Sequence, residues 1–102
     1  MNKIISLLGF AAKAGKLAYG FEATLSALKS KKSALVLIAE DISPKSRKEV
    51  VFFAEKTNTQ HIILEGATIK DVSDAVGRKC GIVSVNDTGF ADALIKANKA
   101  AE

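Results

Sequence analysis

Apolar residues recur at helical spacing in the first part of the chain. Ile4, Leu8 and Ala11 belong to one apolar face, and Gly15 follows as a residue that ends helices. A second apolar stripe opens after Gly20 and gives way to several lysines, which suit a helix C-terminus. The pattern predicts two helices joined by a short segment, residues 17–19.

Three short aliphatic runs predict strands. Residues 34–39 form the continuous run Ala-Leu-Val-Leu-Ile-Ala, which is typical of a strand covered on both faces. Residues 61–64 and 82–85 give two further runs of this kind. We expect residues 34–39 to be the central strand of a sheet.

Helical patterns with recognisable start signals separate these runs. Ser43, followed by a first-turn proline, can cap one helix, and Asp87 can cap the last one. Thr68 with Asp71 resembles a capping box that starts a shorter helix. Strands that alternate with helices place helices on both faces of one sheet. We therefore expect an α/β fold, a three-layer α/β/α sandwich around a small mixed sheet.

The length and composition of the chain indicate one ordinary globular domain. Its 102 residues are enough for one compact core and too few for two. Apolar residues make up 48% and charged residues 25%, a balance found in soluble proteins rather than in disordered or fibrous ones. The longest apolar run is far shorter than a membrane span, so no membrane partner is expected. We expect residues 1–102 to form a single domain.

Basic residues are concentrated in the first half of the chain. The formal net charge is +4, and residues 1–50 hold nine Lys or Arg against four Asp or Glu, whereas residues 51–102 hold six against seven. This balance favours a polyanionic partner without identifying one. The lone cysteine, Cys80, cannot form an internal disulfide and gives no sign of an oxidising compartment. A cytoplasmic location is expected.

The sequence offers few groups for catalysis. His61 is the only histidine and opens an apolar run, where a structural imidazole is more common than a general base. Cys80 stands between Lys79 and Gly81, where positive charge could favour a thiolate, but no histidine motif accompanies it. One cysteine and one histidine cannot make a zinc set, and the glycine spacing does not match a phosphate-binding loop. We expect no catalytic residue, no metal site and no cofactor.

Two adjacent carboxylates, Glu40 and Asp41, follow the expected central strand at the end where α/β proteins place ligands. One interpretation is a metal or acid–base site. The other is an exposed pair that leads into the helix capped by Ser43. The sequence leaves both open and favours the second.

Several segments of the chain together resemble a known family. They are a glycine-opened helix with the lysines that follow it (20–33), the central run with its two carboxylates (34–41), Val72-Ser-Asp-Ala-Val-Gly77, and Gly81-Ile-Val-Ser-Val85. These segments resemble the kink-turn-binding ribosomal proteins of the L-seven-Ae and L-thirty-e type, and in particular the bacterial YlxQ-like proteins. The resemblance spans nearly the whole chain.

The resemblance implies a ligand and a site. In that family the fold is the α/β/α sandwich expected above, and structured RNA, a kink-turn or ribosomal RNA, binds at one end. A monomeric RNA-binding protein associated with the ribosome or with RNA processing is therefore expected. The family's second helix carries a G-x-N-E type motif, and the loop after L-G-x-A-x-G covers the RNA bend. Carried onto this chain, the RNA-binding residues are Gly20, Phe21, Glu22 and Ala23 in the helix and Arg78, Lys79, Cys80 and Gly81 in the loop.

The physical properties of these residues suit RNA. A helix N-terminus presents unpaired N–H groups to phosphate, and Gly20 lets the backbone come close. Lys13 and Lys16 lie just upstream in the sequence and are expected to add phosphate contacts. Arg78 could bond phosphate or stack on a splayed base.

The altered motif leaves alternatives open. Glu22 keeps an acceptor for guanine N–H donors, whereas Ala23 offers no polar side-chain group. Phe21 either stacks on a base or packs as a partly buried aromatic at the start of the helix. The lysines near residue 30 either contact RNA or keep a helix end soluble.

Two functions of different class follow from the sequence. The preferred one is a non-enzymatic protein that binds structured RNA. The alternative is a protein-interaction adaptor that keeps the fold but binds RNA weakly or not at all. Phosphate contacts weaken steeply with added salt, so the salt dependence of RNA retention distinguishes the two.

Overall fold

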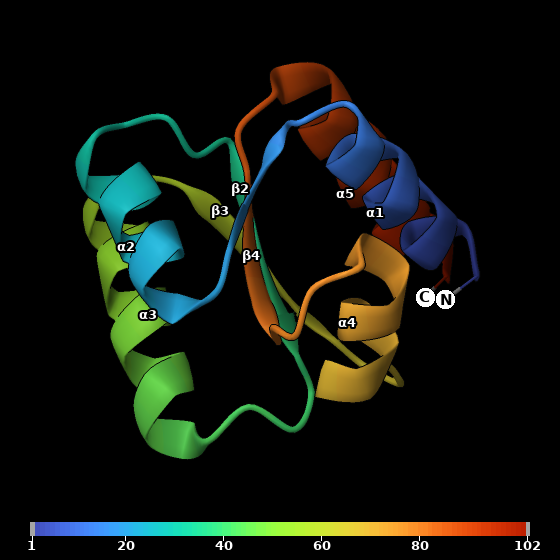
Figure 1. The fold of residues 1–102 in the computed structure, drawn as a ribbon. Helices are drawn as coiled ribbons and strands as arrows, with labels where there is room; N and C mark the ends of the chain where they lie inside the picture. The colour runs from blue at the N-terminus through green and yellow to red at the C-terminus, as the bar shows by residue number, and fades with distance from the viewer. Residues whose placement is uncertain (1, 102) are drawn as a thin grey trace.

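One four-stranded sheet separates two layers of helices (Figure 1). A computed structural model describes residues 2–101, with side chains from residue 3 to residue 100. None of the helices in this part of the chain is both long and apolar enough to cross a membrane. In chain order the elements are α1 (Asn2–Lys13), β1 (Leu17–Tyr19), α2 (Phe21–Lys29), β2 (Leu35–Ala39), α3 (Pro44–Lys56), β3 (Gln60–Leu64), α4 (Ile69–Val76), β4 (Ile82–Val85) and α5 (Thr88–Ala101).

The sheet is mixed, as expected. Its strand order is β1-β4-β2-β3, with β2 and β3 parallel and the other neighbours antiparallel. Leu37 of β2 lies opposite Ile62 on one side and Val83 on the other. All five residues of β2 are buried, because strands flank it and helices cover both faces. The prediction of a central strand is confirmed.

The first strand was not predicted from the sequence. Leu17, Ala18 and Tyr19 form β1, which pairs antiparallel with β4 so that Leu17 lies opposite Val85. Three residues are too few to show an alternating pattern, so only pairing with β4, distant in sequence, makes the segment a strand. As a result, α1 ends at one end of the sheet and α2 begins at the other.

The two faces of the sheet have separate cores. Helices α1, α4 and α5 cover one face, and α2 and α3 cover the other (Figure 1). Successive side chains of β2 alternate between them: Leu35 and Leu37 pack in the first core, Val36 and Ile38 in the second. The predicted three-layer α/β/α sandwich is confirmed.

The start signals predicted for three helices are present. Ser43 accepts a hydrogen bond from the N–H of Ser46 at the start of α3. Thr68 and Asp71 form a reciprocal capping box at α4, and bonds from Thr68 hold the pKa of the Asp71 carboxyl below its usual value. Asp87 accepts the N–H of Phe90 at 2.8 Å and caps α5.

One hydroxyl in the core is unpaired. Thr24, in the first turns of α2, is fully buried, and its Oγ1 has no hydrogen-bond partner in the part of the chain that the structure describes. A buried polar group without a partner costs about 1–3 kcal/mol. We therefore expect the Thr24 hydroxyl to lower the stability of the fold.

Thr24→Val is expected to raise the free energy of unfolding by about 1 kcal/mol, because valine is similar in shape and has no hydroxyl to bury. Urea titration should show a higher midpoint with an unchanged slope. Thr57→Val is the matched control, since Thr57 Oγ1 donates to the carbonyl of Phe53 at 2.8 Å, and it should lower the midpoint. A lower midpoint for Thr24→Val would contradict the assignment.

Candidate nucleic-acid interface

The N-terminus of α2 begins abruptly at Gly20. This residue has φ 93°, a conformation that L side chains rarely adopt, and its N–H donates to the carbonyl of Ile82 at 2.8 Å. Within the part of the chain that the structure describes, no side chain caps the helix start. The first N–H groups of α2 are therefore left without a side-chain acceptor, the arrangement that suits an anion.

The side chains at this helix start divide between core and surface. Phe21 is partly buried and packs against the core under α2 and α3, so packing is the role that the structure gives it. Glu22 and Ala23 are exposed. Phe21 and Glu22 line one end of an open hollow of about 710 Å³ that continues along α2 to Lys29.

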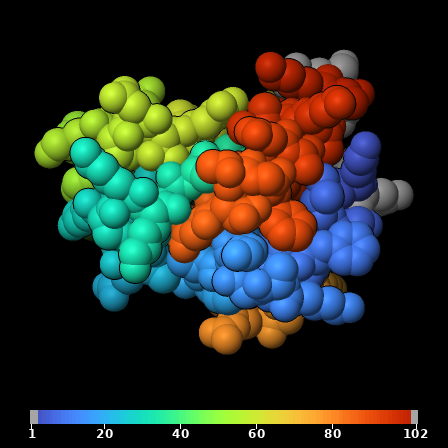
Figure 2. Space-filling view, turned by 90° about the horizontal axis from the view of Figure 1, so that it is seen from above, coloured from blue at the N-terminus to red at the C-terminus, as the bar shows by residue number. Residues whose placement is uncertain are grey.

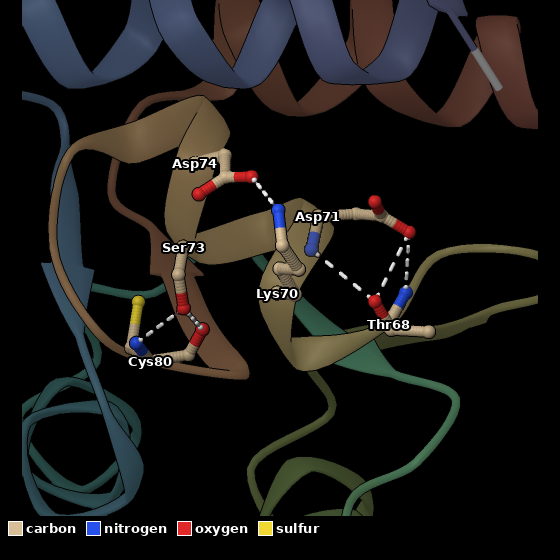
Figure 3. Close-up of polar contacts among 6 residues, drawn as sticks. All are labelled: Thr68, Lys70, Asp71, Ser73, Asp74 and Cys80. Atoms are coloured by element: carbon tan, nitrogen blue, oxygen red, sulfur yellow. Dashed lines mark hydrogen bonds and ion pairs between the residues drawn. The ribbon is translucent and has the colours of Figure 1, made fainter.

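The loop between α4 and β4 is fixed to α4 by one hydroxyl. Helix α4 ends at Gly77, which has the left-handed φ of 76°. The Oγ of Ser73 accepts the N–H of Cys80 and donates to its carbonyl, both at 3.0 Å (Figure 3). The backbone of this loop is therefore held in place from inside the domain.

Two of the four predicted loop residues are buried. Cys80 is 8% exposed, and burial raises the pKa of its thiol, which keeps it protonated near neutral pH. A Cβ at Gly81 would lie 2.6 Å from Ile42 Cδ1 and 2.7 Å from Ile69 Cγ1. Arg78 and Lys79 are exposed. In this loop, only the side chains of Arg78 and Lys79 are therefore accessible to a ligand, whereas Cys80 and Gly81 determine the course of the backbone.

The helix start and the loop lie together. The guanidinium of Arg78 lies 4.6 Å from the centre of the ring of Tyr19, the residue immediately before Gly20. The carbonyl of Ile82, which follows the loop, accepts the N–H of Gly20. The first residues of α2 and the α4–β4 loop meet at the same end of the sheet (Figure 1). We call residues 20–23 and 77–81 the candidate site.

Lys13 and Lys16 lie away from this site. Lys13 ends α1, and the carbonyl of Lys16 accepts the N–H of Asn86 at 2.8 Å, beyond the last residue of β4. Strand β1 separates Lys16 from Gly20, and an extended chain advances about 3.3 Å per residue, or roughly 13 Å over this interval. The two lysines are near the site in sequence but sit at the opposite end of the sheet.

Glu40 and Asp41 have a structural role that the sequence did not reveal. Glu40 Oε1 accepts the N–H of Gly66 at 2.6 Å, and Asp41 Oδ1 accepts the N–H of Ile69 at 2.7 Å. Both side chains therefore hold the segment that leads into α4. No group of three or more potential metal-ligating side chains occurs within the described residues, and the pair is exposed, as its favoured interpretation required.

His61 and Cys80 lie on opposite faces of the sheet. His61 lines a hollow of about 550 Å³ together with residues of α3, among them Phe52, and with Ile63. Cys80 belongs to the core under α1, α4 and α5. The two side chains therefore cannot form a nucleophile–base pair.

Residues 2–95 match the model of a protein family described as "Ribosomal protein L7Ae/L30e/S12e/Gadd45 family". The "Large ribosomal subunit protein eL30" of Dictyostelium discoideum is 31% identical over 95% of this chain and 88% of its own length. The "RNA-binding protein YlxQ" of Enterococcus faecium is 28% identical over 88% of this chain and 85% of its own length.

A solved structure shares the fold at low sequence identity. The "Giardia lamblia 15.5kD RNA binding protein" superposes with a TM-score of 0.81 and is 16% identical. The match covers 96% of this chain and 87% of that one. At this identity the likeness concerns the arrangement of helices and strands alone.

Proposed function

This chain belongs to the ribosomal protein L7Ae/L30e/S12e/Gadd45 family, and from that membership we propose that it binds structured RNA of the kink-turn kind without catalysing a reaction. The observation that carries the proposal is the meeting of an uncapped helix start with a basic loop. The start of α2 offers N–H groups, and Arg78 beside Tyr19 and the exposed Lys79 add positive charge next to it.

The exposed polar groups of the candidate site have distinct tasks in this proposal. The N–H groups at the start of α2 and Lys79 bind phosphate oxygens at the bend. Arg78, whose guanidinium already lies over the Tyr19 ring, is held ready to bind phosphate or to stack on a base that leaves the helix. Glu22 accepts hydrogen bonds from guanine N–H donors.

The chemistry of the remaining groups supports binding without catalysis. The Cys80 thiol has a raised pKa, and His61 lies on the other face of the sheet. We propose that the protein acts in the cytoplasm as a monomer, associated with the ribosome or with RNA processing. Crosslinking in cells followed by sequencing of the bound RNA tests this assignment, and enrichment of bent internal loops with tandem G·A pairs is the expected result.

Arg78→Ala combined with Lys79→Ala is expected to lower affinity for a kink-turn RNA and to flatten its salt dependence while the fold stays intact. Each lost phosphate contact should reduce the slope of log affinity against log salt by about 0.7 to 0.9. Fluorescence titration of the same RNA between about 50 and 200 mM salt measures the slope.

Lys96→Ala combined with Lys99→Ala is the matched control, because it removes the same charge from exposed positions on α5. The control variant should keep the slope of the wild-type protein. If the loop variant and the control variant bind alike, the α4–β4 loop takes no part in RNA binding.

The adaptor alternative is favoured by one surface feature. Phe52 of α3 is 58% exposed and Ile63 of β3 is 40% exposed, and the two line the same hollow with His61. Exposed apolar side chains that lie together are common at protein interfaces. An adaptor would bind RNA weakly or not at all and would show no such salt slope, so the titration above also separates the two functions.

A further inference from the structure

Four segments meet at the end of the sheet opposite the candidate site. They are residues 13–16, 29–33, 56–59 and 86–88, and Figure 2 views the molecule from this end. Asn86 donates to Lys16 at 2.8 Å, and Ala34, which follows residues 29–33, donates to Val85, which precedes residues 86–88, also at 2.8 Å. Residues 56–59 join them through a hollow that Lys56 and Asn58 line together with Lys29 and Lys31. The four segments contain one carboxylate, Asp87, and six lysines, which we call the lysine surface: Lys13, Lys16, Lys29, Lys31, Lys32 and Lys56.

The candidate site has the opposite charge balance. The segments around it, residues 20–23, 40–43, 65–68 and 77–81, contain four carboxylates and two cations. The carboxylates are Glu22, Glu40, Asp41 and Glu65, and the cations are Arg78 and Lys79. Among these connecting segments, positive charge is therefore concentrated at the end of the sheet that lies away from the candidate site, and this concentration favours a polyanion there.

The lysine surface has little internal neutralisation. All six lysines are exposed, and Asp87 is engaged in capping α5 through the N–H of Phe90. The ion pair found within the described residues joins Lys70 and Asp74, on α4. The ammonium groups of the lysine surface are thus free to meet an external anion.

Helix dipoles account for half of these lysines. Lys13, Lys29 and Lys56 stand in the last turns of α1, α2 and α3, where cations stabilise the helix C-terminus. The other three, Lys16, Lys31 and Lys32, follow the helix ends and lie in the connecting segments. Stabilisation of the helix C-termini therefore does not explain why these three lysines are present.

Lys31 occupies a conformation that glycine would adopt more easily. Its φ is 61°, in the left-handed region where an L side chain is unfavourable and glycine is common after a helix. Lys31 also lines a hollow of about 470 Å³ with Lys29 and Lys56, whose ammonium groups lie 5.0 and 5.9 Å from the centre of the Phe53 ring. A lysine held at a conformational cost beside two others points to a role for its charge.

We propose that the lysine surface binds the phosphate backbone of a second RNA segment, distinct from the one at the candidate site. Lysines are point charges on flexible stems, so they position a backbone without reading bases. The candidate site and the lysine surface lie at opposite ends of the sheet, so a compact RNA bend at the first does not cover the second. The protein then bridges two RNA segments. The bridge rests on the proposed function, whereas the lysine surface itself does not depend on kink-turn recognition.

A triple variant tests the charge of the surface. Lys16→Gln, Lys31→Gln and Lys32→Gln together should reduce the salt slope for a plain RNA duplex by about 2 to 2.7, for three lost contacts. The control variant changes Lys3, Lys96 and Lys99, which are exposed on α1 and α5, to glutamine and should keep the wild-type slope. Equal slopes for the two variants overturn the proposal.

A single substitution separates charge from backbone strain. Lys31→Gly should stabilise the fold and at the same time weaken duplex binding. Asn58→Gly is its control, because Asn58 also has a left-handed φ, 56°, and carries no charge. Asparagine adopts this conformation more easily than lysine, so Asn58→Gly should change stability less, and it should leave duplex binding unchanged. If Lys31→Gly binds the duplex as tightly as Asn58→Gly does, Lys31 takes no part in binding and the proposal fails for that residue.

The bridge is tested by whether protein bound to one RNA retains a second RNA. A kink-turn RNA is immobilised, and a labelled duplex is added with wild-type protein or with the lysine triple variant. Wild-type protein should retain the duplex, and the triple variant should occupy the kink-turn RNA without retaining it. Capture by the triple variant overturns the bridge. Failure of every protein to bind the kink-turn RNA would reject the proposed function, while the duplex slopes would still decide on the lysine surface.

Discussion

Gly81→Ala is expected to lower the free energy of unfolding by about 2 kcal/mol, within the range for an atom forced into a filled core. The new Cβ would lie 2.6 Å from Ile42 Cδ1 and 2.7 Å from Ile69 Cγ1. The end of the Ile42 side chain can swing away, but Ile69 Cγ1 is bonded directly to Cβ, so it moves only through a change of χ1 or a shift of the backbone at the start of α4. Urea unfolding measures the loss.

The same substitution should weaken kink-turn binding, because Gly81 connects the loop to the sheet. Its carbonyl accepts the N–H of Ala39 at 2.7 Å, so the strand end cannot shift without loss of that bond. The movement that makes room for the new Cβ must therefore occur in the α4–β4 loop, which carries Arg78 and Lys79. Titration of a kink-turn RNA under conditions where the variant is folded measures this effect separately from stability.

Two controls isolate the steric cause. Gly15→Ala faces open space but has φ 70°, so it should cost only the conformational strain, about 1 kcal/mol. Ile42→Val removes the Cδ1 atom, and combined with Gly81→Ala it should destabilise less than the sum of the two single changes. A Gly81→Ala variant as stable as Gly15→Ala would show that Ile42 and Ile69 move aside at little cost in free energy.

The features of the fold that could be predicted are those encoded within a few residues. The cap at Ser43, the capping box of Thr68 with Asp71 and the cap at Asp87 each use a side chain and a backbone group three residues apart. The continuous run in β2 predicts burial on both faces because all of its residues are aliphatic. Strand β1 lacks such a local signal, since its three residues depend on β4, more than 60 residues later in the chain.

The candidate site was predictable in its elements but not in its geometry. The glycines at residues 20 and 77 indicate sharp turns, and both have a positive φ in the structure. Gly81 is instead a residue where the surrounding side chains leave no room for a Cβ. The burial of Cys80 depends on Ser73 and on the core under α1, α4 and α5, and the sequence does not show these contacts. Long-range bonds also explain the missed role of Glu40 and Asp41, whose partners lie 26 and 28 residues away.

Proximity in sequence was misleading for the lysines. Lys16 precedes Gly20 by four residues, and without β1 the two would be expected to lie close together. Strand β1 instead carries the chain from one end of the sheet to the other between them. The same strand places Lys16 beside the segments that contain Lys31 and Lys32, so one unpredicted element determines both the composition of the candidate site and the existence of the lysine surface.

Glu22→Gln is expected to weaken binding of a kink-turn RNA by about 1.5 to 3 kcal/mol, the range for hydrogen bonds to a charged group. Glu22 is exposed beside the uncapped start of α2, where its carboxylate can accept guanine N–H donors at a sheared G·A pair. Glutamine keeps the size of the side chain and loses its charge. Binding of a plain duplex should hardly change, and titration of both RNAs with both proteins measures the difference.

The opposite role for Glu22 predicts the opposite sign. If the carboxylate only complements the positive end of α2, Glu22→Gln costs at most about 1 kcal/mol of folding stability, and the loss of a negative charge strengthens attraction to RNA phosphates. Glu65→Gln is the matched control, since Glu65 is an exposed carboxylate at the same end of the sheet, outside residues 20–23 and 77–81, and it reports this general electrostatic effect. Weaker kink-turn binding for Glu22→Gln alone assigns base recognition to Glu22. Tighter binding by both variants would leave only nonspecific contact with the backbone at the start of α2.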